Sequence, residues 1–100
     1  MMTDAMITDQ DNELVVSGNL NFASVVDLWQ KSLPMISAKK ELVFNLSHVS
    51  SANSAALALL IEWIKYAKKN SKQIRFLHIP PQLLAIASVA EINREDFSFV

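Results

Sequence analysis

Apolar and β-branched residues gather in short runs along this chain, and such runs are typical of strands. Three runs are strong and one is weak: Glu13–Ser17, Glu41–Leu46, Lys72–His78 and, more weakly, Met6–Thr8. The polar stretch 9–12 between the weak run and the first strong one predicts a hairpin turn. Gly18 and Asn19 are expected to end the first strong strand. The polar stretch 47–53 is expected to be a loop.

Two longer segments have apolar residues at the three- and four-residue spacing of amphipathic helices. The first begins after Asn21, a residue suited to capping, and continues to about Ile36. Its apolar positions are Phe22, Val25, Val26, Leu28, Trp29 and Leu33. We expect Pro34 to kink or shorten its end, because proline has no amide hydrogen for the helix. The second helix is expected over 54–70.

The last part of the chain predicts one more helix and an edge strand. Pro80 and Pro81 end the preceding strand, and Pro81 suits the first turn of a helix that reaches about Ile92. Phe97 and Phe99 alternate with polar residues, which favours a short final strand. The alternation of strands and helices predicts an α/β fold with a mixed, mostly parallel sheet of four to five strands and about three helices. With 100 residues, one domain over 1–100 is expected.

The helix expected over 54–70 has two lines of apolar residues, although a single line is enough for a helix to pack on one face of a sheet. One line holds Leu57, Leu60, Ile61 and Ile64, and the other holds Leu59, Trp63 and Tyr66. The second line is explained either by packing against a neighbouring helix or by a partner protein, since aromatic residues are common at interface centres. Small residues at its start, such as Ala55, would let a partner approach closely.

The chain offers little for catalysis, metal binding or cofactors. It has no cysteine, its two histidines lie thirty positions apart, and its single glycine cannot form a phosphate-binding loop. A net charge of −1 disfavours general binding to nucleic acid. The acidic first thirteen residues lack the basic start of a secretory signal, and no apolar run approaches the length of a membrane span. We therefore expect a non-enzymatic protein without cofactor or metal.

Basic residues cluster from Lys65 to Arg75, with no acidic residue between them. One interpretation is a solvated helix end whose cations complement the helix dipole. The other is a surface for an anionic partner, such as a lipid headgroup, whose binding would collapse in salt.

A polar segment leads directly into the helix that begins at Ser54. Asn53 or Ser54 can accept a hydrogen bond from an unpaired amide of the first turn. A phosphate on Ser54 would also lie where helix amides favour an anion. The corner is therefore either a cap alone or a contact or modification point.

The stretch 42–57 reads LVFNLSHVSSANSAAL and resembles the signature of STAS domains, a strand followed by a loop and an Asp-Ser/Thr-x-Gly helix start. The family includes anti-sigma-factor antagonists and domains of sulfate transporters, and the resemblance covers about 13–92. Within it, the chain looks most like the small STAS subunit of the Mla phospholipid ABC transporter. The Ser/Thr position of the family motif falls on Ser54, and its Asp position falls on the neutral Asn53. Ala55 or Ala56 replaces the glycine of the motif.

The resemblance implies a cytoplasmic accessory subunit, peripheral to the inner membrane, that binds the transporter's ATPase and supports outer-membrane lipid asymmetry. The partner-binding residues would be Asn53, Ser54, Ala55, Leu59, Trp63 and Tyr66. The alternative is a regulatory switch of the anti-sigma-antagonist type, phosphorylated on Ser54. The missing carboxylate at Asn53 disfavours that alternative.

Overall fold

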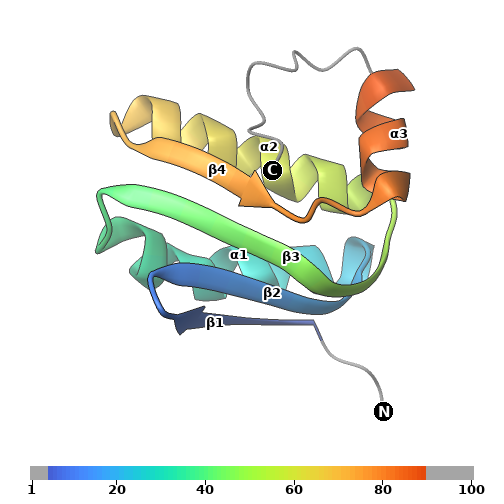
Figure 1. Cartoon of the computed structure of the whole chain (residues 1–100), viewed down its shortest axis with the longest axis horizontal. Coiled ribbons are helices and arrows are strands. Elements are labelled where there is room, and N and C mark those ends of the chain that lie inside the picture. The colour runs from blue at the N-terminus through green and yellow to red at the C-terminus, as the bar shows by residue number, and fades with distance from the viewer. Residues whose placement is uncertain (1–4, 90–100) are drawn as a thin grey trace.

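A four-stranded sheet organises the structure, a computed structural model that describes residues 5–89. The strands are in the order β1-β2-β3-β4; β1 is antiparallel to β2, and β2, β3 and β4 are parallel. The elements are β1 (Met6–Gln10), β2 (Glu13–Leu20), α1 (Phe22–Ser37), β3 (Glu41–Ala52), α2 (Ser54–Lys69), β4 (Gln73–Leu77) and α3 (Pro81–Val89). The predicted mixed, mostly parallel sheet with three helices is confirmed (Figure 1).

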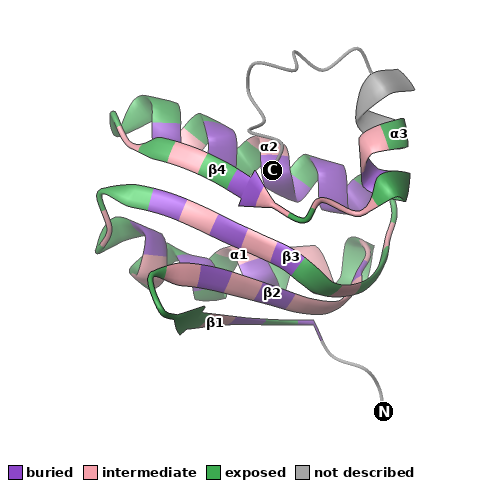
Figure 2. Ribbon diagram, in the orientation of Figure 1, coloured by how far each residue is buried: buried purple, intermediate pink, exposed green. Residues whose placement is uncertain are grey.

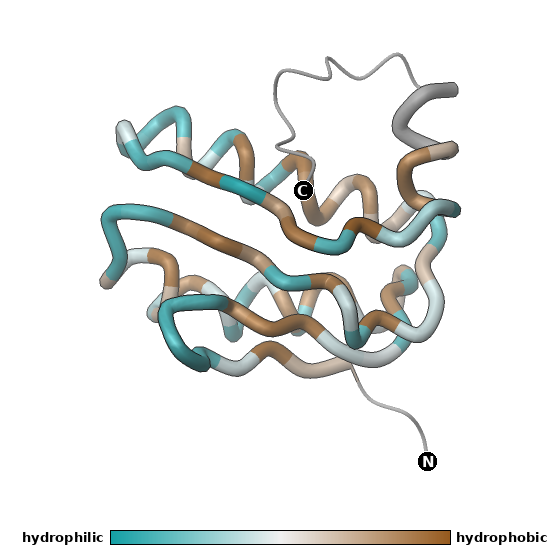
Figure 3. Tube along the Cα trace, viewed as in Figure 1, coloured by the Kyte–Doolittle hydropathy of each residue, from teal (hydrophilic) through white to brown (hydrophobic). Residues whose placement is uncertain are grey.

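Helices α1 and α2 cover the same face of the sheet, and α3 packs against α2 (Figure 1). This follows from the topology, because successive parallel strands joined by right-handed crossovers place both connecting helices on one side. Buried and partly exposed residues alternate accordingly along β2 and the first half of β3 (Figure 2). The apolar segments of neighbouring strands lie side by side in the middle of the sheet (Figure 3).

The hairpin between β1 and β2 is tighter than the sequence predicts. Its turn consists of Asp11 and Asn12, with φ of 48° and 69°. Two left-handed residues match the twist of paired strands, and Asp and Asn tolerate this conformation better than most side chains. Asp9 and Gln10 therefore belong to β1 and pair with Leu14 and Glu13.

Strands β2 and β3 extend beyond the ends predicted for them. Gly18 and Asn19 do not end β2, and the expected loop over 47–53 is strand as far as Ala52. Each of these polar segments finds hydrogen-bonding partners in the other, with Gly18 opposite Val49 and Leu20 opposite Ala52. The pairing shifts register twice, between Val15 and Ser17 and between Gly18 and Asn19, and each shift places an extra residue in β3. Pairing between distant segments overrides the local composition here.

Pro34 does not shorten α1, which continues to Ser37. The expected shortening is therefore not observed, and the alternative, a kink, stays a prediction. The expected third helix is present as α3 to Val89, and its predicted continuation to Ile92 lies outside the described residues. The edge strand expected around Phe97 also lies outside them, and a single domain over 1–100 stays a prediction.

Trp63 of α2 joins the sheet to both long helices. Its side chain is 0% exposed and stacks on Phe44 of β3, with ring centroids 4.1 Å apart. Phe44 in turn stacks on Phe76 of β4 at 5.5 Å. The indole Nε1 donates a hydrogen bond of 2.9 Å to Ser32 Oγ, and Ser32 is the buried polar side chain of α1. Ser32 Oγ itself donates to the carbonyl of Trp29 at 2.7 Å.

We expect Trp63→Ala to lower the free energy of unfolding by about 3–5 kcal/mol, because it removes a fully buried aromatic ring and leaves a cavity. Trp63→Phe should cost about 1 kcal/mol through the lost hydrogen bond to Ser32. Urea unfolding followed by circular dichroism measures both.

Phe22→Ala is the matched control, since this aromatic residue of α1 is exposed and should change the stability by no more than about 0.5 kcal/mol. Equal losses for Trp63→Ala and Phe22→Ala would contradict the role given to Trp63.

Candidate interaction site at the carboxyl ends of β2 and β3

Helices α1 and α2 begin at the same end of the sheet (Figure 1). Each follows a parallel strand, so both amino termini emerge where β2 and β3 end. The two starts are joined directly, because the amide of Asn53 donates to the carbonyl of Leu20 at 3.3 Å. Residues far apart in the sequence therefore share one surface.

Both helices are capped by asparagine. Asn53 Oδ1 accepts from the amide of Ala55 at 2.8 Å, as the sequence predicts for this corner. Asn21 Oδ1 accepts from the amides of Ala23 and Ser24 at 2.9 and 3.0 Å, and Ser24 Oγ accepts from the amide of Asn21 at 3.0 Å. These bonds satisfy first-turn amides that have no partner within the helix. The backbone at both helix starts is thereby fixed.

Asn19 links the cap of α1 to the end of β3. Its Oδ1 accepts from Ser50 Oγ at 2.8 Å and from Ser51 Oγ at 2.7 Å, across from β3. Its carbonyl accepts from Ser24 Oγ at 2.8 Å. The register of β2 and β3 shifts at this point. Together with Asn53 and Ser54 at the start of α2, these residues form an uncharged surface of amides and hydroxyls, here called the polar corner: Asn19, Asn21, Ser24, Ser50, Ser51, Asn53 and Ser54.

Ser54 is the first residue of α2, and its side chain is exposed. Its neighbour Asn53 is exposed as well. A serine hydroxyl can both donate and accept a hydrogen bond, and the capped backbone beneath it holds it in one place. The corner therefore offers a rigid, uncharged hydrogen-bonding surface to another molecule.

The structure separates the other predicted contact residues from this surface. Ala55, Leu59 and Trp63 are buried in the core of the protein, so the prediction that they form an exposed docking face is wrong. The alternative, packing against a neighbouring helix, is the one observed. Tyr66 is half-buried, with its ring edge-on to Trp29 of α1 at 6.4 Å.

The basic cluster is used partly within the fold. Lys72 Nζ donates to the carbonyls of Ile36 and Ser37, at 2.6 and 3.2 Å, and so caps the end of α1. It also lies 5.5 Å from the centre of the Tyr66 ring. Lys65 pairs with Glu62 at 3.6 Å. The hydrogen bonds of Lys72 show that one cation of the cluster complements a helix end, that of α1.

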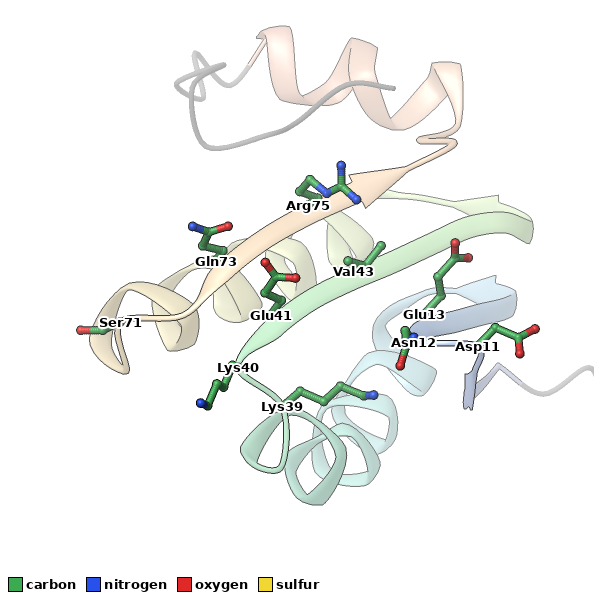
Figure 4. Close-up of a pocket in the computed structure, with 10 residues that line it drawn as sticks. All are labelled: Asp11, Asn12, Glu13, Lys39, Lys40, Glu41, Val43, Ser71, Gln73 and Arg75. Atoms are coloured by element: carbon green, nitrogen blue, oxygen red, sulfur yellow. The ribbon is translucent and has the colours of Figure 1, made fainter.

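A solvent-open hollow of about 810 Å³ lies at the other end of the sheet, where β3 and β4 begin (Figure 4). Its charged side chains balance, with three acidic and three basic residues: Asp11, Glu13, Glu41, Lys39, Lys40 and Arg75.

Within residues 5–89, no three His, Asp or Glu side chains gather as a metal site. No helix in the described part of the chain is long and apolar enough to cross a membrane.

Comparison with known proteins decides the family. A family model described as "Mlab, STAS domain" matches residues 4–100. The chain belongs to this STAS family. The predicted resemblance to STAS domains, and among them to the Mla subunit, is thereby confirmed. A curated relative, the intermembrane phospholipid transport system binding protein MlaB of Haemophilus influenzae, is 29% identical over 80 residues, covering 76% of each chain.

Solved structures agree with this assignment. A chain of the Acinetobacter MlaFEDB complex in an ATP-bound conformation superposes on this STAS domain with a TM-score of 0.74 and 27% identity, covering 91% of this chain and 96% of that one. A point variant of RsbS from Moorella thermoacetica has a TM-score of 0.72 at 19% identity, over 98% and 86% of the chains. The anti-sigma-factor antagonist SpoIIAA has 0.71 at 14%, over 96% and 87%. The last two show a shared fold.

Sequence reasoning found the cap at Asn53 but missed the residues that surround it. The sequence predicts that Asn19 ends a strand and that Phe22 and Val26 are apolar positions of a helix, without deciding whether these two are buried. Phe22 and Val26 are exposed, and Asn19 connects the start of α1 to the end of β3. The only signal for Asn19 in the sequence is its position shortly before a capping asparagine, which does not reveal its partners on β3.

Asn53→Ala should lower the free energy of unfolding by about 1 kcal/mol, because the amide of Ala55 loses its capping acceptor. Asn53→Asp keeps an acceptor at the same place and should restore the stability. Thermal or urea unfolding of the three proteins tests this, and equal stability of the alanine and asparagine forms would contradict the cap.

Proposed function

We propose that this STAS domain is a non-catalytic accessory subunit that binds the ATPase of an ABC transporter, one that moves phospholipid to maintain outer-membrane lipid asymmetry. The observation that carries the proposal is the exposed Ser54 on a rigid corner, in a chain that matches the MlaB family over residues 4–100. The relatives support the partner, since one is named as part of a phospholipid transport system and another belongs to an ATP-bound transporter complex.

The chemistry of the corner suits docking better than catalysis. Its side chains are asparagines and serines, and none of them is a strong base or a charged group. Caps and hydrogen bonds hold them before any partner arrives, so little conformational freedom is lost on binding. A protein surface with complementary polar groups would be recognised by its shape and hydrogen bonds. In this role the protein is cytoplasmic and reaches the inner membrane only through the complex.

Ser54→Glu should disrupt the complex with the ATPase subunit. The carboxylate is larger than the hydroxyl and would have to be desolvated in the interface, which is costly without a charged partner. The helix itself should not suffer, because a negative charge in the first turn is favourable to the helix dipole. Co-purification of this protein with a tagged ATPase subunit measures the effect, and unfolding curves verify the fold.

Ser71→Glu is the matched control, with the same change at the exposed opposite end of α2. It should leave co-purification unchanged. If the ATPase subunit retains the Ser54→Glu variant to the same extent as the Ser71→Glu variant and the unchanged protein, the polar corner is not the docking surface.

A second function has one observation in its favour. The exposed Ser54 hydroxyl at the start of a helix is open to modification, and the dipole would stabilise a phosphate there. The protein would then act as a switch of the anti-sigma-antagonist type. The neighbouring Asn53 lacks the family's carboxylate, which disfavours this role.

Incubation with cell extract and ATP, followed by mass spectrometry, separates the two functions. The transporter role predicts no phosphate on this protein, whether or not Ser54→Ala is introduced. Phosphate that appears on the unchanged protein and is absent from Ser54→Ala would favour the switch.

A further inference from the structure

Helix α1 carries a line of apolar side chains that the fold leaves in solvent. Phe22, Val26 and Leu33 are 72%, 60% and 36% exposed, and Trp29 between them is half-buried. Their spacing of four, three and four residues places all four on one side of the helix. We call them the α1 line. Burying such side chains is favourable, so a surface that gathers them calls for a partner.

The α1 line begins at the polar corner. Phe22 directly follows the capping Asn21, and Asn21 and Ser24 belong to the corner. The contact of Trp29 with Tyr66 shows that the line faces the side on which α2 lies. On α2, Ser54 and Ala58 are both exposed and one turn apart. The start of α2 is tied to the residue before Asn21 by the hydrogen bond from the Asn53 amide to the Leu20 carbonyl, so a partner that covers the α1 end of the polar corner meets Phe22.

Charge identifies the kind of partner. The corner and the α1 line consist of uncharged residues, and the charged neighbours on α1, Asp27 and Lys31, pair with each other at 2.9 Å. Interface centres between proteins are depleted of charge and enriched in aromatic residues. A helix that lies on an anionic membrane instead needs several cations along its polar face, and Lys31 is the only Lys or Arg of α1. The features favour a protein partner over a lipid surface.

We propose that the α1 line is the apolar half of the docking surface for the ATPase subunit, with Phe22 as its anchor and the polar corner as the other half. This inference rests on the proposed function and adds to it the residues that supply binding affinity. The partner surface is then an uncharged one with an apolar pocket that accepts the Phe22 ring beside acceptors or donors for Ser54.

Titration of the purified, tagged ATPase subunit with this protein tests the inference through the dissociation constant Kd. Phe22→Ala should raise Kd at least about tenfold, the scale of an interface hot spot. Val26→Ala, on the same line, should raise it less but measurably. Met6→Ala is the matched control, because Met6 is 54% exposed but belongs to the edge strand β1, where it pairs with Ser17, and not to α1 or the polar corner. It should leave Kd within about twofold. Unfolding curves accompany each variant.

The outcomes separate the inference from the function on which it rests. If Ser54→Glu weakens binding while Phe22→Ala and Val26→Ala behave like Met6→Ala, the inference is wrong and the proposed function stands. If the unchanged protein does not bind the ATPase, both are wrong. Sedimentation of this protein alone gives a further test: a dimer that Phe22→Ala dissociates would assign the α1 line to a second copy and overturn the inference.

Discussion

The position of Trp63 between β3 and α1 determines how the two long helices lie on the sheet. Its ring stacks on Phe44, and its indole nitrogen donates to Ser32. One side chain therefore fixes how closely α2 lies to the sheet and how closely it lies to α1. An apolar residue of the same size would fill the space without the bond. The hydrogen bond adds direction, since it requires Ser32 to face α2. The rotation of α1 about its own axis follows from that contact.

That rotation has a consequence on the outer side of α1. Leu28, Ser32 and Ile36 are the buried residues of α1. Phe22, Val26 and Leu33 lie on another side of the helix, which neither the sheet nor α2 covers completely. Three of the four large hydrophobic side chains that are exposed in the described part of the chain therefore lie on α1. The aromatic residue that looked most available for a partner, Trp63, is the one the core needs most.

The parallel arrangement of β2, β3 and β4 divides the molecule into two ends of different chemistry. At the carboxyl ends of β2 and β3 the two helices begin, and asparagine and serine side chains satisfy their amides. At the other end lie the hairpin turn, the lysines that follow α1 and the end of α2, which are hydrophilic (Figure 3). The residues that line the hollow at this end carry charges of both signs. Separating charge from the neutral corner leaves a surface that a protein partner can cover without desolvating ions.

The sequence by itself determined the order and type of the elements, the parallel α/β class, the cap at Asn53 and the family, because periodicity, capping and the motif over 42–57 are local properties of the chain. It did not determine that 47–52 is strand, that Asn19 joins Ser50 and Ser51, or which aromatic residues are exposed. Those depend on contacts between residues far apart along the chain: the pairing of β2 with β3 and the bond of Trp63 with Ser32. A helical pattern shows which residues share a face, but only the packing of the neighbouring elements decides which face is buried.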